Sequence, residues 1–327
     1  MDKINLLKKP KTNIQIMQKN VLLKYKIFTQ FLKENYLEIY IELCNIYSDI
    51  MGRFYFTNFK TYTSEIYKLY IDLYNKYDLL IIDNPQFMRT MLITRGTNYT
   101  QNNKSIFTLM NREEALGNID ADPIIYHVAN QANQRFFIEH IFKSLNKLLL
   151  DSVESEFYFT LDFFNLKNDQ NKVVFGGVFK LTINFTTETI KNLINSSFDC
   201  VGLLLIILIN EKNKKNFNAK GLNLLDFYFE QINITVWPRF EAIFELHLNS
   251  LKLITAKSFK ILEKTLGPKI IVSRYVGNDS SYYFFFFFIT LNLKTFILFQ
   301  EKVFFCCCCN ICNTWFFQCF LILFIIL

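Results

Sequence analysis

The most constraining feature of this sequence is the spacing of its apolar residues, which recur every three or four positions from Ile14 to Leu73. Residues spaced in this way share one face of an α-helix, because the helix turns once every 3.6 residues. The spacing predicts three successive helices with apolar seams that pack as an antiparallel bundle or rod, with an extended coiled coil as the alternative. The three seams are Ile14, Met17, Val21, Tyr25, Phe28 and Leu32; Tyr36, Tyr40, Leu43, Tyr47, Ile50 and Phe54; and Phe59, Tyr62, Ile66, Leu69 and Leu73.

Helical patterns also dominate the rest of the chain up to Tyr275. Asp120-Ala121-Asp122-Pro123 predicts a helix start, and the apolar run Val201–Ile209 is too short to cross a bilayer and suits a buried helix. With only 9 Gly and 5 Pro, an all-β fold rich in tight turns is disfavoured. We therefore predict an all-α fold of stacked helical bundles, forming a rod of antiparallel helices. The predicted domains are a coiled-coil-like helical bundle at 1–82, a connecting loop region at 83–120, a helical bundle domain at 121–275 and a low-complexity hydrophobic tail at 276–327.

One segment, at 173–186, conflicts with this pattern. Phe179, Leu181, Ile183 and Phe185 alternate with polar residues, and Gly176-Gly177 precedes them. Taken alone, this alternation predicts a hairpin strand.

Charge and cysteine usage exclude several classes of protein. The formal net charge of +7 is spread over short basic clusters among acidic residues, so no nucleic-acid partner is expected. The first twenty residues contain no apolar core of a signal peptide, and we expect no secretion. Only Cys44 and Cys200 lie outside the last fifty residues, which fits a reducing compartment without a disulfide framework.

No motif for catalysis or for a cofactor emerges. The three histidines are His127, His140 and His247, and although His140 follows Glu139, the second histidine of an HExxH helix is missing. Gly176-Gly177 lacks the pattern of a phosphate-binding loop. We expect no catalytic residue, no cofactor and no metal ligand, and therefore no enzyme.

The tail from Val276 to Leu327 differs in composition from everything before it. It has four charged residues, a run of phenylalanines at 284–288 and four consecutive cysteines at 306–309. The C-x-x-C at 309–312 has no matching second pair, so zinc is not expected. Val303–Leu327 has 25 uncharged residues, enough for one membrane span, which gives the alternative of a tail-anchored membrane protein of unknown role. We favour translated non-coding sequence, because T-rich DNA encodes such runs of Phe and Cys.

A candidate partner interface lies in the stretch Trp237-Pro238-Arg239-Phe240-Glu241. Trp and Arg are enriched in the residues that dominate protein–protein binding, so we name Trp237, Arg239 and Phe240 as interface candidates. The alternative is that Trp237 packs in the core and Pro238 kinks or interrupts a helix.

Several stretches resemble one family, that of vacuolar protein sorting-associated protein 52, in the same order and spacing over most of residues 14–275. The Trp237-Pro238-Arg239-Phe240-Glu241 stretch is the most specific. The resembling segments are LLKYKIFTQFLKENYLEIYIELCNIY from Leu22, IFTLMNREEAL from Ile106, IDADPIIYHVANQANQRFFIEHIFKSLNKLLLDSVESEFYF from Ile119, DFYFEQINITVWPRFEAIFELHLNSL from Asp226, and GPKIIVSRY ending at Tyr275.

This resemblance implies a non-catalytic, helical subunit of the Golgi-associated retrograde protein (GARP) complex and its endosomal counterpart (EARP). Such a subunit acts in vesicle tethering, in retrograde transport from endosomes to the trans-Golgi network, as a peripheral membrane protein on the cytosolic face of these organelles. The implied partners are the other GARP/EARP subunits, SNAREs and Rab or Arf-like small GTPases. The resemblance further implies that 173–186 is helical, and we follow it there against the local alternation. It also implies that this chain starts downstream of the family's coiled-coil portion.

Overall fold

The computed structural model describes residues 2–8, 13–72, 74, 112, 114–166 and 168–252. The chain's contacts divide it into two units, one of residues 1–73 and 114–243 and one of residues 74–113 and 244–327. The fold below is that of the first unit. Among the described residues there are helices and a single isolated bridge between Tyr70 and Phe136, but no strand. The predicted all-α fold is thereby confirmed. The four domain ranges stay predictions, and the tail at 276–327 lies outside the described residues.

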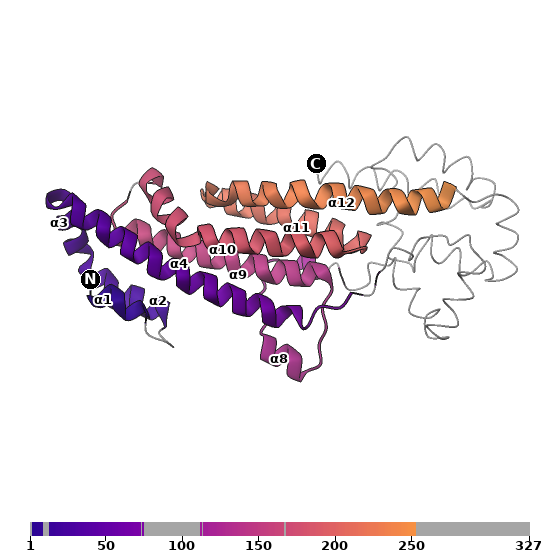
Figure 1. The fold of residues 1–327 in the computed structure, drawn as a ribbon, viewed down its shortest axis with the longest axis horizontal. Coiled ribbons are helices and arrows are strands. Elements are labelled where there is room, and N and C mark those ends of the chain that lie inside the picture. Colours follow the sequence, from indigo (N-terminus) through magenta and orange to yellow (C-terminus); the bar gives the residue numbers. More distant parts are fainter. Residues whose placement is uncertain are drawn as a thin grey trace, which may run out of the picture. The chain divides into compact units, whose positions relative to one another are not determined.

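Five long helices dominate the described part of the chain, and Figure 1 shows them running lengthwise beside one another. Shorter elements precede and connect them. The α-helices are α1 (Asp2–Asn5), α2 (Ile14–Ile16), α3 (Lys26–Asn35), α4 (Leu37–Tyr67), α7 (Glu114–Gly117), α8 (Tyr126–Gln131), α9 (Ile138–Phe163), α10 (Asn168–Ser196), α11 (Cys200–Ala219) and α12 (Asp226–Lys252). A π-helical turn (Met17–Val21) and 3-10 turns (Leu6–Lys8, Leu22–Tyr25 and Asn223–Leu225) complete the set.

The predicted second and third helices are one continuous helix, α4. No proline interrupts Leu37–Tyr67, and Gly52 alone is not enough to end a helix whose seam is buried. Tyr47, Phe59 and Ile66 on this seam are almost completely buried. The prediction of three separate helices was therefore wrong, although the seam itself was identified. The predicted helix start at Asp120–Pro123 was also early, because α8 begins at Tyr126.

The strand-like segment at 173–186 lies inside α10. Its buried residues follow helical spacing (Val178, Phe179, Thr182 and Thr186), while Leu181 is 56% exposed. The local alternation therefore predicted the wrong structure, and the family resemblance predicted the right one. Packing against neighbouring helices decides here, because α10 lies along both α4 and α9.

Close approach between α4 and α10 depends on small residues. A Cβ atom on Gly52 would lie 3.2 Å from the Gly177 carbonyl oxygen, and one on Gly177 would lie 2.9 Å from Ser48 Cβ. Gly177 sits at the edge of this contact, with part of its backbone exposed. The Gly176-Gly177 pair thus marks a close helix crossing instead of a hairpin.

Helix α11 carries the apolar run Val201–Ile209, which is almost entirely buried, as predicted. Its fully buried Asn210 donates to the Phe229 carbonyl (3.0 Å) and to Asn233 Oδ1 (2.8 Å), joining α11 to α12. Helix α12 continues through Pro238 without interruption. None of the described helices has the length and apolar character needed to cross a bilayer. The proposed span at 303–327 lies outside the described residues.

A buried carboxylate ties the N-terminal segment to the bundle. Glu156 on α9 is 1% exposed and accepts hydrogen bonds from the Tyr47 hydroxyl, from Tyr55 (2.9 Å) and from Gln18 Nε2 (2.8 Å). Gln18 Nε2 also lies 2.9 Å from the Tyr47 hydroxyl. Burial raises the pKa of Glu156, and the three hydrogen bonds oppose that shift. Because this group joins three segments, it fixes their register.

Candidate protein-interaction surface

The predicted interface residues Trp237, Arg239 and Phe240 lie on α12 in different environments. Trp237 is 38% exposed, whereas Phe240 is 4% exposed and belongs to the core. Arg239 donates through Nε (3.0 Å) and Nη2 (2.8 Å) to the Ser197 carbonyl, and its guanidinium lies 4.6 Å from the centre of the Phe198 ring. Arg239 therefore holds the turn after α10, where a cation is favoured by the helix dipole. The structure leaves Trp237 as the accessible member of the three.

A second surface, not foreseen from the sequence, is built on α3, and it starts from the way α9 ends. Asn165 follows the last turn of α9 with φ 48°, a left-handed conformation that asparagine tolerates, and Leu166 N–H returns to the Leu161 carbonyl (3.2 Å). This Schellman-type ending leaves the carbonyls of residues 163–165 directed away from their own helix. Such groups require outside donors when they are buried.

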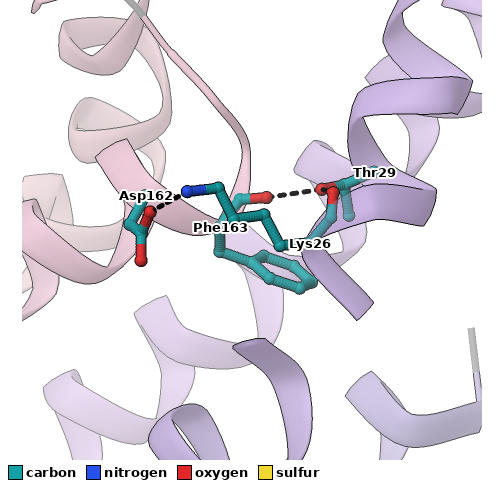
Figure 2. A network of polar contacts seen from close by, with 4 residues as sticks. All are labelled: Lys26, Thr29, Asp162 and Phe163. Carbon is teal, nitrogen blue, oxygen red and sulfur yellow. Dashed lines mark hydrogen bonds and ion pairs between the residues drawn. The ribbon is translucent and has the colours of Figure 1, made fainter. Parts of the chain in front are cut away.

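The α3–α4 segment supplies those donors, one for each carbonyl. Thr29 Oγ1 donates to the Phe163 carbonyl, Tyr40 donates to that of Phe164 (2.8 Å) and Lys33 Nζ to that of Asn165 (2.6 Å). Figure 2 shows Thr29 directed at the Phe163 carbonyl, together with the neighbouring ion pair between Lys26 and Asp162. The polar side of α3 therefore points into the protein, where lysines also complement the negative end of the α9 dipole.

The opposite, apolar side of α3 is consequently turned to solvent. We define the α3 outer face as five side chains of α3 and the α3–α4 junction, each more than half exposed. They are Ile27 (78%), Phe28 (63%), Phe31 (52%), Tyr36 (54%) and Leu37 (58%). The rings of Phe31 and Tyr36 lie 5.9 Å apart, which links the helix to the junction. Clustered exposed apolar groups of this kind mark interaction surfaces in soluble proteins.

This finding corrects the first predicted seam. That seam placed Tyr25, Phe28 and Leu32 against neighbouring helices, and the second seam began at Tyr36. In the structure Leu32 is half-buried, whereas Tyr25, Phe28 and Tyr36 are exposed. The apolar period was detectable in the sequence, but the capping requirement of α9, which is distant in the sequence, was not. That requirement reversed which side faces inward.

The charges next to the α3 outer face are mostly acidic, although the exposed Lys24 lies about one turn before Ile27 and Phe28. From Ile27 to Met51 the exposed charged side chains are Glu34, Glu38, Glu42 and Asp49. Lys33 is the one lysine in this interval, and it donates to the Asn165 carbonyl at the end of α9. The apolar surface therefore has a carboxylate border.

The titratable residues considered for chemistry do not converge. His127 is exposed, His140 Nδ1 lies 3.2 Å from the buried Glu139, and burial lowers the pKa of His247 to about 4. The described residues contain no group of three metal-ligating side chains. Cys44 and Cys200 are buried free thiols, and burial raises the pKa of Cys44 to about 11. The C-x-x-C at 309–312 lies outside the described residues.

Comparison with known proteins gives a consistent assignment. Residues 49–294 match the family described as "Vps52, C-terminal". This match passes Tyr275, where we placed the end of the resemblance, and so includes the first residues of the predicted tail. No solved structure matches the chain.

Curated relatives also match most of the chain. Vacuolar protein sorting-associated protein 52 A of Arabidopsis thaliana is 32% identical over 275 residues, covering 84% of this chain and 38% of the relative. The Homo sapiens homologue is 28% identical over 259 residues (77% and 35%), and the Schizosaccharomyces pombe protein is 24% identical over 237 residues (72% and 45%). The chain thus spans less than half the length of these relatives. Since a single family match covers most of its residues, the chain belongs to the Vps52 family.

Proposed function

We propose that this chain is a non-catalytic subunit of a multisubunit vesicle-tethering complex that acts in retrograde transport from endosomes to the trans-Golgi network. The proposal starts from membership of the Vps52 family, whose relatives are named as vacuolar protein sorting-associated proteins. A helical scaffold of this kind works through its surfaces. Its partners are the other GARP/EARP subunits, together with SNAREs and Rab or Arf-like small GTPases. Its location is peripheral, on the cytosolic face of the trans-Golgi network and endosomes.

The observation that carries this proposal is the α3 outer face. Five apolar side chains on one short stretch are more than half exposed. The polar side of the same helix is turned inward and donates hydrogen bonds to carbonyls at the end of α9. Burying such side chains contributes about 1.5–3 kcal/mol each. A chain that leaves these apolar side chains exposed is expected to bury them against another protein, as one subunit of an assembly does.

Trp237, Arg239 and Phe240 form a second proposed contact. Trp237 offers the exposed indole, and the buried Phe240 ring lies 6.0 Å from it in an edge-to-face arrangement that holds it in place. Arg239 contributes indirectly, through its two hydrogen bonds to the Ser197 carbonyl, which hold α12 against the turn after α10. Trp237 is therefore the residue of this group that would touch a partner.

Affinity purification of the natively tagged chain tests the proposal. We expect three other large helical subunits to co-purify in similar amounts. The double variant Ile27→Asp/Phe31→Asp should lose most of them, because each change puts a charge into the apolar surface. Phe227→Asp is the matched control, since Phe227 is 71% exposed on α12, away from α3 in sequence. Recovery of the unaltered chain as a lone monomer at every concentration would falsify the proposal.

A cellular readout tests the transport step separately. Depletion of the chain should leave a cycling sorting receptor in endosomes, and re-expression of the unaltered chain should return it to the trans-Golgi network. Normal receptor return in depleted cells would count against a retrograde role, even if a complex is recovered.

A further inference from the structure

The α3 outer face has two properties that together specify its occupant. The first is an apolar ridge, in which Ile27 and Phe31 stand one helical turn apart on the same side, with Phe28 beside them. The second is the carboxylate border. Glu34 lies on the same helix side as Ile27 and Phe31, and Glu38 follows Leu37 directly. Among the described residues no lysine or arginine pairs with Glu38 or Glu42.

We infer that the α3 outer face binds an amphipathic helix of another protein whose apolar seam is bordered by Lys and Arg. This inference rests on the proposed function and names the chemistry of one partner. Helix α3 has ten residues and is about 15 Å long, enough to present two to three turns to a parallel or antiparallel helix. The ridge supplies the buried anchors, and the carboxylates supply complementary charge at the rim.

Two other occupants fit the same surface less well. An anionic membrane leaflet attracts basic segments, and the carboxylates Glu34, Glu38 and Glu42 would be repelled by it. A second copy of this chain, related by a two-fold axis, would bring identical carboxylate borders toward each other, and like charges placed together disfavour association. The charge of the border therefore selects a basic helix over both.

The test uses the full chain and two fluorescently labelled synthetic helices as probes. Both peptides carry the same three-heptad Leu seam; one has Lys at the flanking positions and the other has Glu. Anisotropy titrations should show binding about tenfold tighter for the Lys-flanked peptide, with a preference that shrinks as salt is added. In the triple variant Glu34→Lys/Glu38→Lys/Glu42→Lys the preference should reverse. Because these three side chains are exposed, circular dichroism should show the variant folded.

Apolar anchoring is tested by Ile27→Asp/Phe31→Asp, which should abolish binding of both peptides, while Phe227→Asp leaves it unchanged. Equal affinity for the two peptides, or a preference that survives the charge reversal, would overturn the inference. Two further results would also overturn it. One is flotation of the chain with phosphatidylserine vesicles that depends on Ile27 and Phe31. The other is a dimer in light scattering that the double variant converts to a monomer.

The purification described above separates this inference from the proposed function. If the unaltered chain recovers its subunits and Ile27→Asp/Phe31→Asp recovers them equally well, the docking surface is refuted and the tethering role stands. If the unaltered chain recovers no subunit, the tethering role fails, whatever the peptides show.

Discussion

The contact between α4 and α10 makes a prediction in which two neighbouring glycines respond oppositely to the same substitution. A Cβ on Gly177 would lie 2.9 Å from Ser48 Cβ and 3.2 Å from Ser48 Oγ, while a Cβ on Gly176 would meet nothing within 4 Å. Both glycines are inside α10, so both gain the same helical preference from alanine. The difference between the two variants isolates the helix contact.

The magnitude follows from how far the helices must move. Ordinary contact begins near 3.4 Å, so Gly177→Ala forces α4 and α10 apart by about 0.5 Å at a point where Ser48 is attached directly to its helix. Overpacking of this kind costs about 1–3 kcal/mol. Replacing Gly by Ala inside a helix contributes about 0.5–1 kcal/mol in the other direction. We expect Gly177→Ala to destabilise by about 0.5–2 kcal/mol and Gly176→Ala to stabilise by about 0.5–1 kcal/mol.

Thermal unfolding followed by circular dichroism measures both variants against the unaltered chain. For a unit of this size each kcal/mol shifts Tm by about 2–4 °C. The two variants should therefore differ by about 2–12 °C, with Gly177→Ala the lower. If Gly177→Ala is as stable as Gly176→Ala, or more stable, the close crossing of α4 and α10 is not present.

The remaining predictions concern buried polar groups and their partners. Burial raises the pKa of Glu156, so protonation of this side chain stabilises the fold. This stabilisation is complete below the unfolded pKa of about 4.3 and is lost as pH rises through the folded pKa, so Tm should fall between pH 4 and 8. Glu156→Gln should flatten this fall in Tm. Thr29→Val removes the donor to the Phe163 carbonyl, should cost about 1–3 kcal/mol, and should speed amide exchange in α3. Arg239→Lys loses the two-pronged contact with the Ser197 carbonyl and should lower stability by about 1–2 kcal/mol in denaturant titration.

Each of these has a defined contrary result. An unchanged pH profile in Glu156→Gln would mean that another group sets the profile. Exchange in α3 that is as slow in Thr29→Val as before would show that the capping bonds do not hold the helix. For Arg239, the control is Arg53→Lys at an exposed position, which should leave the free energy of unfolding unchanged. Equal losses of stability at the two positions would contradict a specific contact between Arg239 and the Ser197 carbonyl.

Much of the fold was accessible from the sequence because it depends on local period. The seam of α4 and the buried run of α11 both follow from apolar residues at helical or continuous spacing. Where local period misled, as at Phe179–Phe185, the cause was packing on two faces of α10 by α4 and α9. That arrangement made threonines at 182 and 186 core residues and left Leu181 outside. No sequence window contains that information.

The candidate surface shows the same division more sharply. The sequence by itself predicted a helix through Phe28 and Leu32, because hydrogen bonding within a helix and the spacing of its apolar side chains are local properties. Only the tertiary structure decided which side faces water. The end of α9 presents carbonyls that need donors, and Thr29, Lys33 and Tyr40 satisfy them. A buried carbonyl without a partner costs more than an exposed phenylalanine, so the polar side turns inward and the apolar side is left for a partner.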